Sequence, residues 1–162
     1  MTKTAPGLAP VTGKNPEILI LGSFPGSISL AKGEYYGNPR NQFWQILEQL
    51  FGIDAALPYA ARVALLVEHR IALWDVLCTC SREGSMDAAI RDATANDIRG
   101  FVAAHPAIRC IVLNGSTAGR YFKRFDPGLS GVVLPSTSPA YAGMPFAEKV
   151  RRWTCIRSQI NH

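Results

Sequence analysis

The stretch EILILGSFPG, residues 17–26, places a short apolar run directly before a turn that contains two glycines and a proline. Such a run, rich in Ile and Leu, is typical of a strand buried on both faces of a parallel sheet. The residues that follow predict a rigid turn whose backbone can approach a ligand closely. The turn is neither a P-loop nor a G-x-G-x-x-G dinucleotide motif, so an ordinary tight turn remains the alternative for GSFPG alone.

Outward from this stretch, apolar runs alternate with segments of helical periodicity. Further strands are predicted over residues 71–77, 108–113 and 132–134, and helices over residues 41–51, 58–69, 97–104, 116–125 and 145–160. Short strands that alternate with helices indicate βαβ units. We therefore expect a three-layer α/β/α single domain over residues 16–162 with a small, mainly parallel four-stranded sheet, preceded by a flexible N-terminal arm over residues 1–15. Ligands of such folds bind at the carboxyl ends of the strands, where the loops gather.

Length and composition agree with one globular domain. The chain has 162 residues, of which 48% are hydrophobic and 18% charged, and a net charge of +5. Disorder, a collagen helix and a disulfide scaffold are excluded by these values. The sequence has no apolar run of about 18 residues, and its first residues lack the apolar centre of a signal peptide. We expect a cytoplasmic, monomeric protein that does not contact a membrane.

The positive charge is concentrated in the last third of the chain. Residues 1–104 carry nine Lys or Arg against ten Asp or Glu, whereas residues 105–162 carry eight against two. The basic side chains are interleaved with the aromatic side chains of Tyr121, Phe122, Phe125 and Trp153. A one-sided positive field beside aromatic rings favours a polyanion such as nucleic acid. An ordinary solvated basic surface accounts for the charge equally well.

A second polar loop follows the last predicted strand and has the sequence LPSTSPA, residues 134–140. Three hydroxyl side chains and free N–H groups between two prolines, ahead of a helix, predict a phosphate cradle. The alternative is a loop whose Ser and Thr side chains only cap the next helix.

Four motifs together resemble the uracil-DNA glycosylase superfamily, and its hypoxanthine-DNA glycosylase branch most closely. They are LGSFPGSISLAKGEYYGNPRNQFW (residues 21–44), ALWDVL (72–77), VLNGSTA (112–118) and LPSTSPA (134–140), in this order across most of the chain. The first motif is the most specific. The resemblance implies a monofunctional enzyme that flips a deaminated base, hypoxanthine first, out of DNA and hydrolyses its N-glycosidic bond without a cofactor. The implied partner is DNA that contains a deaminated base.

The resemblance also implies roles for individual residues. Tyr36 stacks on the flipped base, with a core aromatic beside Phe43 and Trp44 as the alternative. Asn38 positions water, and Asn114 contacts the base or only satisfies a turn. Asp75 is expected either to be hydrogen-bonded in the core or to face the pocket, because an unpaired charge inside an apolar strand is costly. The residues expected to hold DNA phosphates are Gly26, Ser27, Pro135, Ser136, Thr137 and Ser138.

Two positions depart from the superfamily pattern. Phe24 stands where most members have Asp or Asn, which argues against efficient removal of ordinary uracil. Asn38 is therefore the residue expected to position the attacking water. Leu134 stands where several members have His or Asn, so help to the leaving base is expected from backbone N–H groups, Asn114 or Ser23. Asn41 is expected to cap the helix that follows it.

Tyr141 and Met144 are the candidates for the wedge that fills the duplex after base flipping, because apolar side chains commonly enter such gaps. A flexible hinge around residues 142–143 is the alternative.

Other chemistries receive little support from the sequence. The four cysteines lack the spacing of an iron-sulfur or zinc site, and the three histidines form no metal motif, so we expect reduced thiols and no metal. Ser23 after a strand also resembles an esterase nucleophile, but no His base is expected beside it. A uracil- or xanthine-directed glycosylase and a non-catalytic protein that binds damaged DNA remain alternatives.

Overall fold

The computed structural model describes residues 5–82 and 87–159, and its centre is a parallel sheet of four strands. The strand order is β3 (Ile71–Asp75), β2 (Ile18–Gly22), β6 (Cys110–Asn114) and β7 (Val132–Leu134), with every neighbouring pair parallel. All five residues of β2 are buried, as expected for a central strand covered on both faces. The predicted fold class is confirmed.

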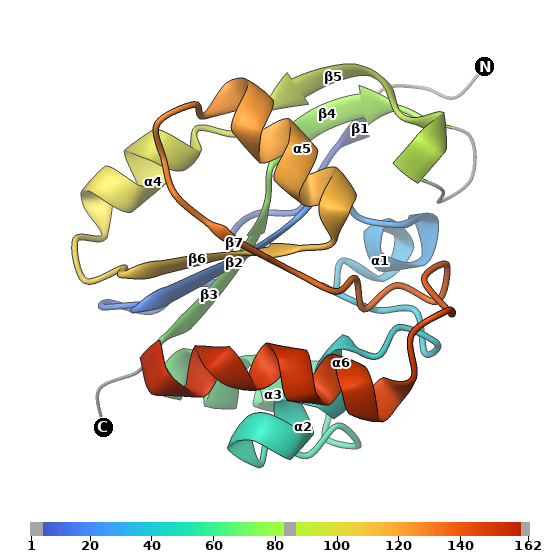
Figure 1. Ribbon diagram of the computed structural model, residues 1–162, viewed down its shortest axis with the longest axis vertical. Coiled ribbons are helices and arrows are strands. Elements are labelled where there is room, and N and C mark those ends of the chain that lie inside the picture. Colours follow the sequence, from blue (N-terminus) through green and yellow to red (C-terminus); the bar gives the residue numbers. More distant parts are fainter. Residues whose placement is uncertain (1–4, 83–86, 160–162) are drawn as a thin grey trace.

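Helices cover both faces of this sheet (Figure 1). On one face, Ile18 and Ile20 pack in a core with helices α2 (Phe43–Phe51), α3 (Tyr59–Glu68) and α6 (Phe146–Trp153). On the other face, Leu19 and Leu21 pack with α4 (Ile98–Ala104) and α5 (Ser116–Phe125). The alternation of side chains along β2 therefore supplies both cores.

A second sheet, absent from the sequence prediction, lies on the α5 side of the molecule (Figure 1). It is antiparallel and consists of β1 (Ala5–Pro6), β4 (Leu77–Ser81) and β5 (Arg91–Ala95). The predicted strand over residues 71–77 is wrong at its end, because the chain turns at Val76 from one sheet into the other. The Val76 N–H donates to the Gly22 carbonyl (2.8 Å), and the Asn96 side chain donates to the Asp75 carbonyl (2.8 Å).

The N-terminal segment also differs from the flexible arm predicted for residues 1–15. Residues 1–4 lie outside the described residues, but β1 pairs with β4, and Val11 exchanges two backbone hydrogen bonds with Leu73 at the edge of the parallel sheet. The Tyr35 hydroxyl donates to the Ala9 carbonyl (2.8 Å). These pairings fix the segment across both sheets.

The helix boundaries differ slightly from the prediction. A short helix α1 (Ser27–Lys32) was not predicted, and a 3-10 turn η1 (Asp87–Ala89) precedes β5. The last predicted helix, 145–160, divides into α6 and a 3-10 helix η2 (Thr154–Gln159); its residue 160 lies outside the described residues. No helix in the described ranges is long and apolar enough to cross a membrane.

Candidate active site

A cavity of about 530 Å³ opens at the carboxyl ends of the parallel strands. Gly22, Asp75 and Asn114, which end β2, β3 and β6, lie in its wall together with the loop after β7. Most of the predicted site residues line it: Ser23, Phe24, Gly26, Tyr36, Asn38, Asp75, Asn114, Ser136, Thr137, Ser138 and Tyr141. Ser27, Pro135 and Met144 do not line it. The volume is typical of a small-molecule site.

Asp75 faces this cavity from the end of β3, although the residue is only 5% exposed. Burial, reinforced by the nearby Asp87 carboxylate, raises its pKa to about 7, against a smaller opposing effect of Arg82. Its Oδ2 atom has no hydrogen-bond partner among the described residues. Gly22 allows this close approach, because a Cβ at that position would lie 2.6 Å from Asp75 Oδ1. Burial therefore favours the protonated form of this carboxyl group far more than in a solvent-exposed aspartate.

Tyr36 reaches the same part of the cavity through an uncommon backbone conformation. Its φ of 56° lies in the left-handed region, which a tyrosine rarely adopts. One face of its ring stacks on Phe43, with 4.0 Å between ring centroids. Tyr36 therefore also packs as the core aromatic that was the alternative to base stacking. The buried hydroxyl has no described hydrogen-bond partner. Burial and then Asp75 raise its pKa; Asn114 offsets part of this rise, although the two side chains do not meet hydrogen-bond geometry.

Asn38 and Asn41 occupy the loop between Tyr36 and α2. The Asn38 Oδ1 atom accepts the Arg40 N–H (2.9 Å), and Asn38 lines the cavity. The Asn41 Oδ1 atom accepts the Phe43 N–H (2.9 Å) at the start of α2. The N-cap position of α2 is Gln42, whose side chain makes no capping hydrogen bond, so Asn41 binds the first helical N–H from one residue before the cap and does not occupy the predicted capping position. Asn38 keeps its amide protons and a second lone pair on Oδ1 for contacts inside the cavity.

Asn114 binds the loop after β7 with both ends of its amide. Its Oδ1 atom accepts the Thr137 N–H (3.0 Å), and its Nδ2 atom donates to Thr137 Oγ1 (3.0 Å). Thr137 is almost completely buried. The neighbouring Gly115 has a φ of 99°, and a Cβ there would lie 3.0 Å from the Ser136 Cβ. Asn114 and Gly115 therefore set the position of this loop against β6.

The hydroxyl groups of the loop organise its own backbone. Ser136 Oγ accepts the Ser138 N–H (3.2 Å), and Ser138 Oγ accepts the Ala140 N–H (3.2 Å). The Pro135 carbonyl accepts the Trp153 indole N–H (2.9 Å), which ties the loop to α6 and explains why Pro135 stays outside the cavity. Each serine hydroxyl keeps its own proton to donate.

Several residues of the site were not predicted. Asp87 lines the cavity and accepts a hydrogen bond from the Ser23 hydroxyl (2.8 Å). The buried Arg82 lies 3.6 Å from Asp87, donates to the Pro25 carbonyl and covers the Phe24 ring, so it supports the GSFPG turn. Both come from the segment after β4, for which the sequence offered no motif. Ile28, Ser116 and Thr117 also line the cavity.

The environment of Ser23 does not support an esterase. Its hydroxyl faces a carboxylate rather than an imidazole, and the rings of His69 and His105 hydrogen-bond to the Leu65 and Phe101 carbonyls at the ends of their own helices. Within the described ranges, no three His, Cys, Asp or Glu side chains converge as a metal site would require. The four cysteines are unpaired, and of these only Cys80 is buried.

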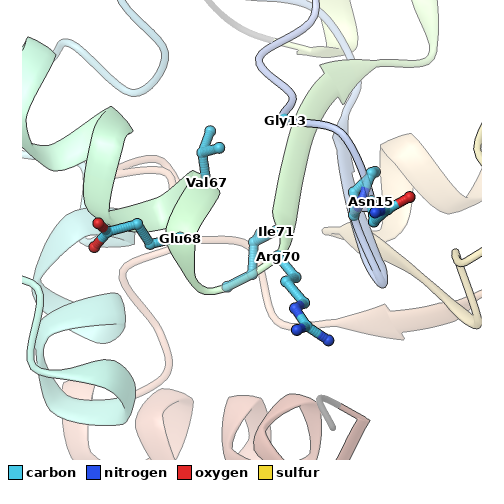
Figure 2. A pocket seen from close by; sticks show the side chains of 7 residues that line it. Gly13, Asn15, Val67, Glu68, Arg70 and Ile71 are labelled. Atoms are coloured by element: carbon cyan, nitrogen blue, oxygen red, sulfur yellow. The ribbon is translucent and has the colours of Figure 1, made fainter. Parts of the chain in front are cut away.

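A second, smaller cavity of about 300 Å³ lies at the opposite end of the parallel strands, beside the first residue of β3. Figure 2 shows it between the loop around Gly13 and Asn15 and the end of α3, with the Glu68 and Arg70 side chains directed away from each other. None of the predicted site residues lines it.

Comparison with known proteins agrees with this geometry. The family model described as the uracil DNA glycosylase superfamily matches residues 9–154. The chain belongs to the uracil DNA glycosylase superfamily. The glycosylase is 41% identical to a hypoxanthine DNA glycosylase of Methanosarcina acetivorans, over 83% of this chain and 86% of the relative. It is 39% identical to a hypoxanthine DNA glycosylase of Methanosarcina barkeri, over 71% of this chain and 73% of the relative.

A solved structure has the same fold. The solution NMR structure of a candidate uracil DNA glycosylase from Methanosarcina acetivorans superposes with a TM-score of 0.83 at 37% identity. The match covers 96% of this chain and 97% of the other. The predictions of the family and of a DNA glycosylase, an enzyme that hydrolyses N-glycosidic bonds, are confirmed.

Proposed function

We propose that the glycosylase excises hypoxanthine from DNA as a monofunctional base-excision repair enzyme. The observation that carries the proposal is the identity of about 40% to two hypoxanthine DNA glycosylases, combined with a cavity lined by the residues of the first motif. The glycosidic bond is inaccessible inside a stacked duplex, so the nucleotide is extruded into this cavity. The enzyme acts as a single-domain cytoplasmic monomer.

The two polar loops at the cavity mouth hold the DNA backbone. Gly26 comes from the loop after β2, and Ser136, Thr137 and Ser138 come from the loop after β7. The Ser136 and Ser138 hydroxyl groups suit phosphate oxygens, which fix the register of DNA on the protein without reading its sequence. The Thr137 N–H already donates to Asn114, so Thr137 holds these two serines in place. Ser27 and Pro135 lie outside the cavity wall; Pro135 ties the second loop to α6, and Ser27 is exposed at the start of α1.

The flipped base binds deeper, next to Tyr36 and Asp75. The Tyr36 ring contributes stacking, which is worth about 1 to 3 kcal/mol per base. The Asp75 carboxyl, with its pKa raised to about 7 by burial, donates a hydrogen bond to the base in its protonated form. Hypoxanthine presents a carbonyl oxygen where adenine presents an amino group. A donor at this position therefore selects the deaminated base over the normal one.

Asn38 orients the attacking water. Its amide cannot take a proton at neutral pH, so it orients water without acting as a strong base. The reaction consequently relies on a dissociative transition state in which the leaving base has largely departed before water adds. Asn114 acts mainly by holding Thr137, and its second amide proton and second Oδ1 lone pair are left for a contact with the base.

The proposal is tested with duplexes that carry a single inosine, uracil or xanthine, followed by alkaline cleavage of abasic sites. We expect the inosine duplex to be cleaved fastest, and Asn38→Ala to lower that rate about 100- to 1,000-fold, the effect of removing one oriented polar contact. Asn15→Ala, which removes an amide at the second cavity, is the matched control and should keep the wild-type rate. Faster release of uracil than of hypoxanthine would contradict the proposed substrate, and wild-type turnover in Asn38→Ala would contradict the role of Asn38.

A further inference from the structure

Helix α6 carries a lysine that is enclosed by protein, whereas the two arginines that follow on the same helix, Arg151 and Arg152, are exposed. Lys149 is 1% exposed, and burial lowers the pKa of its ammonium group. Arg151 and Arg152 on the same helix reach Glu148, at 2.6 and 2.9 Å. Among the described residues, no carboxylate forms an ion pair with Lys149. A buried cation without such a partner is costly, so its retention calls for a functional explanation.

The contacts of Lys149 converge on the loop after β7. Its Nζ atom donates to the Tyr141 carbonyl (2.8 Å) and lies 5.2 Å from the centroid of the Tyr141 ring. Nζ also donates to Gln42 Oε1 (3.0 Å), and the Gln42 backbone N–H donates to the Thr137 carbonyl (3.0 Å). One ammonium group is thus connected to both ends of residues 137–141, the segment that carries Ser138 into the cavity wall and leaves Tyr141 44% exposed.

We propose that Lys149 is a positioning residue for DNA binding: it holds residues 137–141 in their binding conformation and supplies this segment with a fixed positive charge for a backbone phosphate. The inference rests on the proposed function, which assigns this loop to the DNA backbone. A charge beneath the loop is screened less by salt than one on the surface. A phosphate bound above it provides the anion that the protein itself does not.

The test is Lys149→Met, which keeps a similar length and removes the charge. The variant leaves the Tyr141 carbonyl and Gln42 Oε1 without this donor, so the Tm should fall modestly, and the salt dependence of DNA binding is the readout that separates the two roles of Lys149. Binding to a duplex with 2′-fluoro-deoxyinosine, which resists cleavage, should weaken roughly tenfold, the effect of one charge-assisted contact. The slope of log K against log salt should fall by about 0.9, the value for one phosphate contact. Lys14→Met, at an exposed position beside the second cavity, is the control with the same change of formal charge.

A purely structural role of Lys149 predicts a loss of stability without a change in the salt dependence of DNA binding. A lower Tm with an unchanged salt slope would overturn the proposal, as would an affinity and slope equal to those of Lys14→Met. If the methionine variant does not fold, Lys149→Gln replaces it in the test, because glutamine keeps a donor for the Tyr141 carbonyl. A wild-type salt slope in Lys149→Gln would also overturn the proposal. Failure of the proposed function has a different signature, because the wild-type protein would then release no hypoxanthine whatever its DNA affinity.

Discussion

Two buried oxygen atoms, Asp75 Oδ2 and the Tyr36 hydroxyl, lie at the cavity without hydrogen-bond partners among the described residues. Each unsatisfied buried polar group costs about 1 to 3 kcal/mol. The protein tolerates this cost at two neighbouring positions around Gly22, and it also holds Tyr36 at a positive φ. Such a concentration of unfavourable features is characteristic of a binding site whose ligand completes the hydrogen bonds.

Asp75→Asn should separate stability from catalysis by its pH dependence. The folded protein binds a proton at Asp75 up to pH about 7, whereas an unfolded aspartate loses it near 4, so wild-type stability falls across this window. The asparagine variant lacks this loss and should have the higher Tm at pH 8 but not at pH 4.

Excision supplies the second measurement for Asp75. Because only the protonated carboxyl donates to the base, the wild-type rate should fall above pH 7, while Asp75→Asn, whose amide always carries protons, should show a flatter profile. A wild-type rate that stays constant from pH 6 to pH 9 would contradict the donor role of Asp75.

At the scale of elements, sequence periodicity predicted the four parallel strands because each is a short apolar run. The second sheet was missed because its strands, LCTCS and RDATA, lack a run of large apolar residues and do not alternate clearly. The turn at Val76 was missed for the converse reason: the apolar run IALWDVL continues through it. That turn depends on a hydrogen bond donated to the distant Gly22 carbonyl and on one donated by the distant Asn96 side chain, which local sequence cannot reveal.

Most residues predicted from the loop motifs line the cavity, but the motifs did not show how these residues are held. The Asn114 contacts to Thr137 and the support of GSFPG by Arg82 join segments far apart in the chain, and only the folded structure brings them together.

Asn114→Ala tests whether that residue acts through the loop after β7. The substitution leaves the buried Thr137 N–H without its acceptor, so we expect the free energy of unfolding to fall by about 1 to 3 kcal/mol. Urea unfolding measures this loss, and affinity for an uncleavable duplex should decrease in parallel. Unaltered stability together with lost excision would instead indicate that Asn114 serves the base directly.

Over the whole molecule, the basic residues of the last third do not form one surface. Arg109 binds Glu17 where the parallel strands begin, Arg151 and Arg152 bind Glu148, and Lys149 is buried. The exposed basic side chains of α5 are Arg120, Lys123 and Arg124. Helix α5 begins with Ser116 and Thr117 in the cavity wall, so this helix is the strongest candidate for additional contacts with DNA flanking the flipped nucleotide.

Neutralising α5 should therefore weaken DNA binding without changing the base preference. For Arg120→Gln combined with Lys123→Gln, we expect the salt slope to decrease by up to about 1.8, because each phosphate contact contributes about 0.9. Arg109→Gln, at the end of the parallel strands that lies away from the cavity, should keep the wild-type slope. Titrations of the same duplex at several salt concentrations measure both, and equal slopes in the two variants would exclude α5 from the interface.

The N-terminal segment has a practical consequence for anyone who shortens this chain. Its backbone covers the free edge of β3 at Val11 and the free edge of β4 through β1. A protein that lacks residues 1–12 would leave one edge of β3 and one edge of β4 unpaired. Unpaired strand edges are the feature through which chains add to one another during aggregation. We expect the trimmed protein to lose solubility and to form multimers in size-exclusion chromatography. An affinity tag should therefore be added before residue 5 and should not replace the N-terminal segment.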